Sequence, residues 1–270
     1  MRNWITILLI SLCISLNAQT SYTTLSAHSH NDYEQKNPFF EAYNAHFGSI
    51  EADIWAVNGQ LLVAHTKDQL SPERSLGKLY IQPILTKFSE NKGKAWNDLQ
   101  GSFQLLIDLK TSYPETLPLL VEELKKYPEV FNSKANPNAV KVVITGDTPP
   151  PAEFANYPDF IFFDGKFNQK HTAAQRERIA MFSDDLHRYT LWNGGGTISE
   201  KDLKKLRFLI DSVHALPCKI RFWDAPDTPE AWTDVINVIV LVFGGLITTF
   251  LAVSALGDGH DYRKRNCSGT

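Results

Sequence analysis

The sequence predicts an α/β fold, a TIM-type (β/α)8 barrel with an atypical or incomplete last strand. Short β-like runs alternate with longer runs of helical spacing through the body of the chain, which is the pattern of a mostly parallel sheet. No internal repeat and no linker divides this body. At 270 residues the chain is long enough for one large core. A closed barrel is then the simplest arrangement for this number of strand and helix repeats.

The individual elements follow from the spacing of apolar residues. Short apolar runs predict strands at 23–28, 48–55, 61–65, 103–109, 140–145, 160–164, 180–183 and 219–223. Apolar residues at helical spacing predict helices at 114–126, 171–179 and 199–214. Pro114 and Ser199 suit the starts of the first and the last helix. In a barrel of this type the catalytic groups lie at the C-terminal ends of the strands.

The N-terminal residues 1–18 are predicted to be a secretory signal peptide. Arg2 is followed by an apolar run over 4–16 and then by Asn17-Ala18, the order of charge, apolar segment and small residue that such peptides share. A buried N-terminal helix is the alternative. The prediction is therefore an exported protein (periplasmic, secreted or at the cell surface) with its barrel over 19–234.

The segment 235–270 has two interpretations that the sequence leaves open. The run from Val235 to Leu256 carries no charge and is followed by Arg263-Lys264-Arg265, so residues 235–256 have the length and hydropathy of a transmembrane anchor. The alternative is a last buried strand at 236–243 that turns at Gly244-Gly245 into an apolar helix. The first interpretation would attach the barrel to a membrane.

Composition narrows the class of protein. Hydrophobic residues make up 43% of the chain and charged residues 21%, which is typical of a globular protein. The net charge is −3 and the body contains no basic tract, which argues against nucleic acid as a partner. We expect a monomer that acts on a small molecule or a lipid.

Acidic residues lie near the ends of two predicted strands. Glu51 and Asp53 are two positions apart, so their side chains point to one face of the strand, and Asp108 lies in another strand. Carboxylate oxygens are the ligands that Mg²⁺ and Ca²⁺ prefer, and neighbouring carboxylates repel unless a cation lies between them. The sequence therefore predicts one divalent cation, Mg²⁺ or Ca²⁺, at these three residues. An ion-pair network with Lys110 or Arg221 is the structural alternative.

Two histidines, His28 and His65, each follow an apolar strand-like run. Histidine titrates near neutrality, so a pair can divide the roles of acid and base. Together with a cation that neutralises the phosphoryl charge, this set meets the needs of phosphodiester cleavage. One histidine would deprotonate water or a substrate hydroxyl, and the other would protonate the leaving alcohol. Lys110 would add a positive charge at the phosphate.

Short motifs in residues 26–66 resemble those of a known enzyme group in their order and spacing. The motifs are Ala27-His28, Asn37-Pro38, Ala42, Gly48, Glu51-x-Asp53, Asn58-Gly59 and Val63-x-His65. They resemble the glycerophosphodiester phosphodiesterases, within a wider group of phosphatidylinositol-specific phospholipase C-like enzymes and spider sphingomyelinase D enzymes. HSHNDY at 28–33 is similar to the fungal altered-inheritance-of-mitochondria protein family and its bacterial relatives, and LLIDLK at 105–110 is a further, fair match.

The resemblance implies a TIM barrel with a metal-dependent phosphodiesterase site. His28 and His65 would match the catalytic histidines, and Lys110 the phosphate-contacting lysine. The metal ligands would be Glu51, Asp53 and Asp108. The substrate would be a glycerophosphodiester or a phospholipid-type molecule, which implies a role in lipid metabolism.

The sequence departs from this pattern at both ends of the barrel. The usual His-Arg-Gly is His28-Ser29-His30, which lacks the phosphate-binding arginine. His30, Asn31 or Arg221 would then bind the substrate in its place, with Trp223 as a further contact. The resemblance ends after about Asp234, where the apolar segment begins.

Two other functions compete with this prediction. His28-x-His30 after a first strand is also similar to the opening ligands of amidohydrolase-type and polymerase-and-histidinol-phosphatase-type barrels. Those sites need more histidines on later strands, for which the candidates are His171, His187 and His214. The third possibility is a catalytically impaired binding protein on the same barrel, suggested by the missing arginine and the unusual C-terminal segment.

Overall fold

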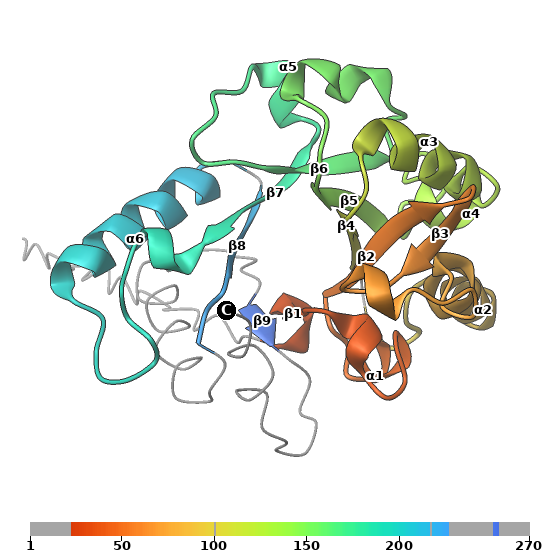
Figure 1. Ribbon diagram of the computed structural model, residues 1–270, viewed down its shortest axis with the longest axis horizontal. Coiled ribbons are helices and arrows are strands. Elements are labelled where there is room, and N and C mark those ends of the chain that lie inside the picture. Colours follow the sequence, from red (N-terminus) through yellow and green to blue (C-terminus); the bar gives the residue numbers. More distant parts are fainter. Residues whose placement is uncertain (1–22, 100, 217, 227–250, 254–270) are drawn as a thin grey trace, which may run out of the picture.

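Seven parallel strands form a curved, open sheet in the computed structural model, which describes residues 23–99, 101–216, 218–226 and 251–253 (Figure 1). The strand order is β8-β7-β6-β5-β4-β2-β1, and the sheet is a half barrel whose edges lie 9 Å apart. The strands are β1 Ala27–Ser29, β2 Ser49–Val57, β4 Gln104–Leu109, β5 Lys141–Gly146, β6 Ile161–Gly165, β7 Ile179–Asp185 and β8 Lys219–Trp223. A short strand β9, Leu251–Val253, pairs in parallel with β1.

The predicted closed (β/α)8 barrel is therefore wrong. The barrel strand predicted at 61–65 is instead β3, Gln60–Val63, which folds back antiparallel onto β2. Asn58 and Gly59 form the hairpin turn with positive φ angles of 51° and 77°, as a two-residue hairpin of this kind requires. Regular alternation also fails, because only a 3₁₀ helix over Pro151–Asn156 lies between β5 and β6.

The helices lie outside the curved sheet (Figure 1). They are α1 Phe40–Asn44, α2 Gln82–Glu90, α3 Tyr113–Leu124, α4 Pro128–Phe131, α5 Ala173–Arg176 and α6 Glu200–His214. Helices α3 and α6 agree with the sequence prediction, and the Ser199 side chain caps α6 by accepting a hydrogen bond from the Asp202 N–H. The helix predicted at 171–179 is shorter, because the chain enters β7 at Ile179.

The two faces of the sheet have different compositions. In β4, Leu105, Ile107 and Leu109 point to the convex side and belong to the main hydrophobic core under the helices. Leu106 points to the concave side, where a small apolar cluster also contains Val143, Ala180 and Met181. Nearer the C-terminal strand ends, the concave side carries polar residues. The fold therefore leaves this end of the concave face available for a polar site.

Most of the two terminal segments lies outside the described residues, including the predicted signal peptide at 1–18. The predicted localisation was an exported protein, with a membrane anchor over 235–256 as one of two interpretations, and two findings overturn the anchor. Residues 251–253, within that run, form a strand and not part of a spanning helix. In the part of the chain that the structure describes, no helix is both long enough and apolar enough to cross a membrane.

Candidate functional site

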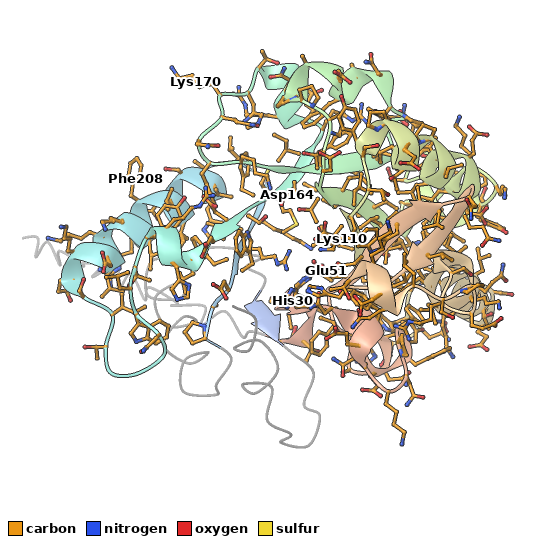
Figure 2. The ribbon with its side chains drawn as sticks, in the orientation of Figure 1. His30, Glu51, Lys110, Asp164, Lys170 and Phe208 are labelled. Carbon is orange, nitrogen blue, oxygen red and sulfur yellow. The ribbon has the colours of Figure 1, made fainter. Side chains whose placement is uncertain are left out.

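Three carboxylates meet on the concave face. One oxygen from each of Glu51, Asp53 and Asp108 lies within 4.8 Å of the others. Strand register explains this convergence, because Asp53 of β2 lies opposite Asp108 of β4, and Glu51 is two positions earlier on the same face. Figure 2 shows Glu51 near Lys110 and His30 at the centre of the half barrel. The three predicted metal ligands are thus brought together.

Each carboxylate also contacts a cationic side chain. Arg221 donates a hydrogen bond of 2.8 Å to Glu51 Oε2. The Nζ atom of Lys110 lies 2.9 Å from Asp53 Oδ2 and 2.9 Å from Asp108 Oδ2. The ion-pair network considered as the structural alternative is therefore present. It is incomplete, since two cations face three carboxylates, and Asp53 Oδ1 is buried with no hydrogen-bond partner.

Burial and mutual repulsion change the pKa values of these acids. Burial, reinforced by the charge of Asp108, raises the pKa of Asp53 to about 6, although Lys110 opposes this shift. Burial likewise raises the pKa of Asp108. Burial alone would raise the pKa of Glu51, but Arg221 and His28 outweigh it and hold this pKa well below its usual range. The Asp53–Asp108 pair thus carries an unfavourable concentration of negative charge.

A hard divalent cation fits this set of donors. Mg²⁺ and Ca²⁺ bind carboxylate oxygens and complete their coordination with water or substrate oxygens. The unpartnered oxygen of Asp53 and the excess negative charge are both features that such a cation would satisfy. Glu51, Asp53 and Asp108 are the residues that would hold it.

His28 is fully buried, and both of its ring nitrogens contact protein groups. Nδ1 lies 2.8 Å from Ser49 Oγ, and Nε2 lies 2.7 Å from Glu51 Oε2. Burial, together with the nearby charge of Arg221, lowers the pKa of His28 to about 4. The imidazole is therefore neutral at physiological pH and fixed in orientation. Sequence reasoning missed Ser49, which nothing but its place two residues before Glu51 could have indicated.

His65 contacts the same acid cluster from its more exposed side. Its side chain is 47% exposed, and Nδ1 lies 3.3 Å from Asp53 Oδ2. The Tyr33 hydroxyl donates to the same Asp53 oxygen at 2.7 Å and lies 3.2 Å from His65 Nδ1. The two histidines thus flank the carboxylates, with His28 next to Glu51 and His65 next to Asp53.

The segment after β1 holds Tyr33, His30 and Asn31 beside the carboxylates. Asn31 has a left-handed φ of 48°, and its Oδ1 lies 3.0 Å from the Tyr33 hydroxyl oxygen. His30 is partly buried, with its ring centroid 6.5 Å from that of His28, and burial lowers its pKa. Sequence reasoning did not select Tyr33, although it lies within the quoted HSHNDY motif.

Asp32 fixes the path of this segment. Its buried carboxylate accepts hydrogen bonds from the Phe39 N–H at 2.6 Å, the Tyr80 hydroxyl at 2.9 Å and the Ser29 hydroxyl at 2.9 Å. Sequence reasoning missed this role as well, because it depends on Tyr80, which is distant in sequence. The HSHNDY motif therefore combines a site segment with its structural support.

Two predicted substrate-binding residues come from β8. Arg221 is buried, and the structure places it as the partner of Glu51. Trp223 lies two positions later at the end of the strand, with 37% of its surface exposed. Arg221 therefore belongs to the site, although its guanidinium is already engaged by a carboxylate.

Gly146 at the end of β5 determines the position of Asp108. Its φ is +77°, and a Cβ atom at this position would come within 2.0 Å of Asp108 Oδ1. Only glycine combines this backbone conformation with the space that the carboxylate occupies. Sequence reasoning missed this residue, because the contact joins two strands.

The histidine-rich site of the amidohydrolase alternative is not found among the described residues. The two groups there with metal-ligand geometry are the carboxylate trio and the set of Asp185, His187 and Asp224. Neither group contains His28 or His30. His214 lies in α6 and His171 in the connection before α5.

Comparison with known proteins identifies the family. The model of the AIM6-like phosphodiesterase domain matches residues 17–164. "Altered inheritance of mitochondria protein 6" of Saccharomyces cerevisiae is 27% identical over an alignment of 255 residues, gaps included, and the match covers 79% of this chain and 65% of the relative. The protein of the same name from Eremothecium gossypii is 28% identical over 244 residues, which cover 75% of this chain and 61% of the relative.

The chain thus spans less than two thirds of the length of these relatives. No solved structure matches it. The names of the relatives refer to mitochondrial inheritance and give no support to the predicted export. They agree with the part of the resemblance that rested on HSHNDY, whereas membership of the wider glycerophosphodiester or phospholipase C-like group, or of its bacterial members, is not shown. Because the domain model covers more than half of the sequence, the chain belongs to the AIM6-like phosphodiesterase domain family, which supports a phosphodiesterase-type enzyme.

Proposed function

We propose that the protein is a metal-dependent phosphoric diester hydrolase. The observation that carries this proposal is the convergence of Glu51, Asp53 and Asp108, with an unpartnered oxygen on Asp53, between two histidines. The proposed substrate is a small-molecule or lipid phosphodiester, of the glycerophosphodiester or phospholipid type. We also propose that the protein acts as a monomer and does not bind nucleic acid.

The carboxylates and Lys110 form the proposed phosphate-binding part of the site. A bound Mg²⁺ or Ca²⁺ would neutralise the charge that develops on the phosphoryl oxygens. Lys110 extends from the end of β4, and its ammonium group can donate to a phosphate oxygen as well as to Asp53 and Asp108. His30 and Asn31 lie beside the carboxylates. They are proposed to contact the substrate in place of the arginine that the glycerophosphodiester phosphodiesterases have in their His-Arg-Gly motif.

The two histidines divide the proton transfers in this proposal. His28 is neutral, and because Nε2–H donates to the Glu51 carboxylate, the lone pair of its ring lies on Nδ1, which accepts from the Ser49 hydroxyl. To act as the base, Nδ1 would exchange the Ser49 hydroxyl for the attacking hydroxyl and accept its proton. Glu51 would stabilise the resulting imidazolium. His65 has Nδ1 engaged by Asp53, which leaves Nε2 for donating a proton to the leaving alcohol. This division of roles is general acid and base catalysis.

Cation binding and turnover test the proposal together. Calorimetry should detect binding of Mg²⁺ or Ca²⁺ to the metal-free protein, and Asp53→Asn should weaken it at least tenfold. Asp98→Asn changes an exposed aspartate and should leave the affinity unchanged. Hydrolysis of bis(4-nitrophenyl) phosphate should stop with a chelator and return with the same cation.

The outcomes separate the competing functions. Restoration only by Zn²⁺ or Mn²⁺ would favour the amidohydrolase-type site. Binding of the cation without turnover of any diester in a substrate panel would favour the catalytically impaired barrel. Turnover that a chelator does not affect would contradict the metal-dependent mechanism.

A further inference from the structure

A pocket on the convex side of the sheet contains none of the residues of the proposed chemistry. It has a volume of about 430 Å³ and lies between the connection from β6 to α5 and the C-terminal end of α6. Phe182 of β7 lines it and belongs to the main hydrophobic core, on the side that the helices cover. Figure 2 shows Lys170, another lining residue, pointing outward, whereas Glu51 and Lys110 lie at the centre of the half barrel. The pocket is therefore separate from the candidate site.

The charged lining of this pocket is cationic. Lys166, Lys170 and Arg176 line it together with His171, and none of the described residues that line it is acidic. Lys166 has a carboxylate nearby, since its Nζ lies 3.6 Å from Asp164 Oδ2. Across the described ranges of the chain, no carboxylate forms an ion pair with Lys170 or Arg176. Two full positive charges at the pocket thus lack a partner from the described part of the protein.

Contacts within the protein hold Arg176 and His171 in place. Arg176 Nη1 donates a hydrogen bond of 2.6 Å to the His171 carbonyl. The His171 ring packs edge-on against Phe182, with the ring centroids 5.8 Å apart. Its Nε2 atom is buried and has no hydrogen-bond partner. Native structures leave few such atoms unpaired, and an acceptor bound in the pocket would pair with Nε2 when this atom carries the ring proton.

The rest of the lining is largely apolar. The rings of Phe167 and Phe182 stack with their centroids 5.8 Å apart, and Val213 and Leu216 line the pocket from the end of α6. A pocket of a few hundred Å³ that combines apolar surface with a few charged groups is typical of a small-molecule site. Its ligand should therefore have both an anionic group and an apolar part.

We propose that this pocket binds a phosphate monoester with an apolar substituent. A phosphate monoester carries close to two negative charges at neutral pH, because its second pKa is about 6. These two charges match those of Lys170 and Arg176, and a guanidinium can donate to two phosphate oxygens at once. A carboxylate carries a single charge and would leave one of the two cations unpaired.

The phosphate group lies between Lys170 and Arg176 in this proposal, with His171 as a further donor. The substituent packs against the apolar lining at Phe167 and Leu216. No residue of the carboxylate site (Glu51, Asp53 and Asp108) takes part in this binding, so it is independent of the proposed function.

Calorimetry with hexyl phosphate tests this binding on the full chain, with a chelator present so that the carboxylate site holds no divalent cation. Lys170→Ala/Arg176→Ala should weaken the binding by about tenfold or more, because charge-assisted hydrogen bonds are lost. Lys201→Ala/Lys204→Ala is the matched control. It also removes two positive charges, but from exposed positions of α6 that do not line the pocket, and should leave the affinity unchanged. Lys170→Ala alone should also weaken the binding, and melting temperatures show whether each variant is folded.

Two further ligands test the chemical class. Heptanoate has a similar chain but a single negative charge, and it should bind several-fold more weakly than hexyl phosphate. Inorganic phosphate has the charge without the chain, and it should bind about tenfold more weakly or less, because it buries no apolar surface against Phe167 and Leu216. Lys110→Ala should leave the affinity for hexyl phosphate unchanged, because Lys110 lies beside the carboxylate site and not in the pocket.

Several results would overturn the proposal. One is the absence of hexyl phosphate binding to the wild type. Equal affinities for heptanoate and hexyl phosphate would show that the pocket does not require a doubly charged group, and equal affinities for inorganic phosphate and hexyl phosphate would show that the apolar lining takes no part. A loss of binding in Lys110→Ala, with none in Lys170→Ala/Arg176→Ala, would place the monoester at the carboxylate site instead.

Discussion

The two sides of the concave face are built differently. The side formed by β1, β2 and β4 carries a dense charged cluster, with His28, Glu51, Asp53 and Asp108 all from the first 110 residues. The side formed by β5 to β8 carries one buried polar residue from each strand: Thr145, Asp164, Ser183 and Arg221. The first side holds the residues of the proposed chemistry. On the second side, Thr145 and Ser183 donate to Asp164, and Arg221 donates to Glu51.

One ion pair connects the two sides. Arg221 of β8 donates to Glu51 of β2, across 170 positions of sequence, and both side chains are buried. The sheet is open, so this contact links strands that do not pair with each other in the described structure. In this half barrel, a buried ion pair therefore joins the two sides of the carboxylate cluster, where no backbone pairing joins them.

The largest effect on turnover should come from removing His65, the exposed histidine next to the carboxylates of β2 and β4. His65→Ala should lower kcat by about 10²- to 10⁴-fold, the usual contribution of a general acid or base. The melting temperature should change little, because the side chain is 47% exposed. His46→Ala, another partly exposed histidine near an aspartate, should leave kcat unchanged. Steady-state rates with bis(4-nitrophenyl) phosphate provide the measurement, and near wild-type turnover of His65→Ala would exclude His65 as the acid.

Breaking the connection between the sides should have the next largest effect. Arg221→Met leaves the Glu51 carboxylate buried without its main cation, and such a loss typically costs about 3–5 kcal/mol of the free energy of unfolding. The double variant Arg221→Met/Glu51→Gln removes the charge as well and should recover much of this loss. Denaturant unfolding measures both. If the single variant were as stable as the double variant, the pair would not connect the two sides.

The two sides also differ in how far the sequence could predict them. Glu51 and Asp53 lie two apart in one strand, so strand periodicity places them together, and the motif order added His28 and His65. Asp164 is the one polar residue of β6, and Ser183 shares no spacing pattern with it, because the two residues lie in different strands. Their contact exists only after β6 and β7 pair, which no short-range signal encodes.

The fold prediction failed for a related physical reason. Strand segments at 48–55, 103–109 and 219–223 were found because buried parallel strands are continuous apolar runs. Their number was misjudged, because an apolar run such as 61–65 does not reveal whether it pairs in parallel or folds back. The Asn58-Gly59 turn carries that information, because a two-residue turn of this kind joins antiparallel strands. Whether a barrel closes depends on the number of strands that pair in parallel, and the strand at 61–65 is not one of them.

Two glycine substitutions can distinguish displacement of Asp108 from the strain that any left-handed residue causes. Gly146→Ala forces a left-handed residue and also brings a methyl group against Asp108 Oδ1 and against the backbone oxygen and nitrogen of Leu109, so we expect a loss of about 2–4 kcal/mol in the free energy of unfolding and weaker Mg²⁺ binding. Gly59→Ala has the same φ of +77° with no atom within 4 Å, so it should lose only about 1–2 kcal/mol. Equal effects of the two variants on Mg²⁺ affinity would show that Gly146 does not position Asp108.

The smallest effect should be a pH dependence of the free energy of unfolding that comes from Asp32. This residue holds the segment that follows β1, next to the carboxylate cluster. Burial raises the pKa of Asp32, although the Phe39 N–H and the Ser29 and Tyr80 hydroxyls oppose the shift. The folded protein therefore binds its proton more tightly than the unfolded chain. This contribution to stability is complete below the unfolded pKa, near 4, and is lost as pH rises through the higher folded pKa.

Asp32→Asn isolates this contribution. The variant cannot ionise at this position, and it exchanges one acceptor for an amide, which should cost about 1–2 kcal/mol of the free energy of unfolding. The difference in unfolding free energy between wild type and variant should be largest near pH 4 and should shrink toward pH 7. Urea unfolding across this range gives both curves. A difference that grows with pH would mean that the folded state favours the ionised carboxylate, and that the hydrogen bonds from Phe39, Ser29 and Tyr80 outweigh burial.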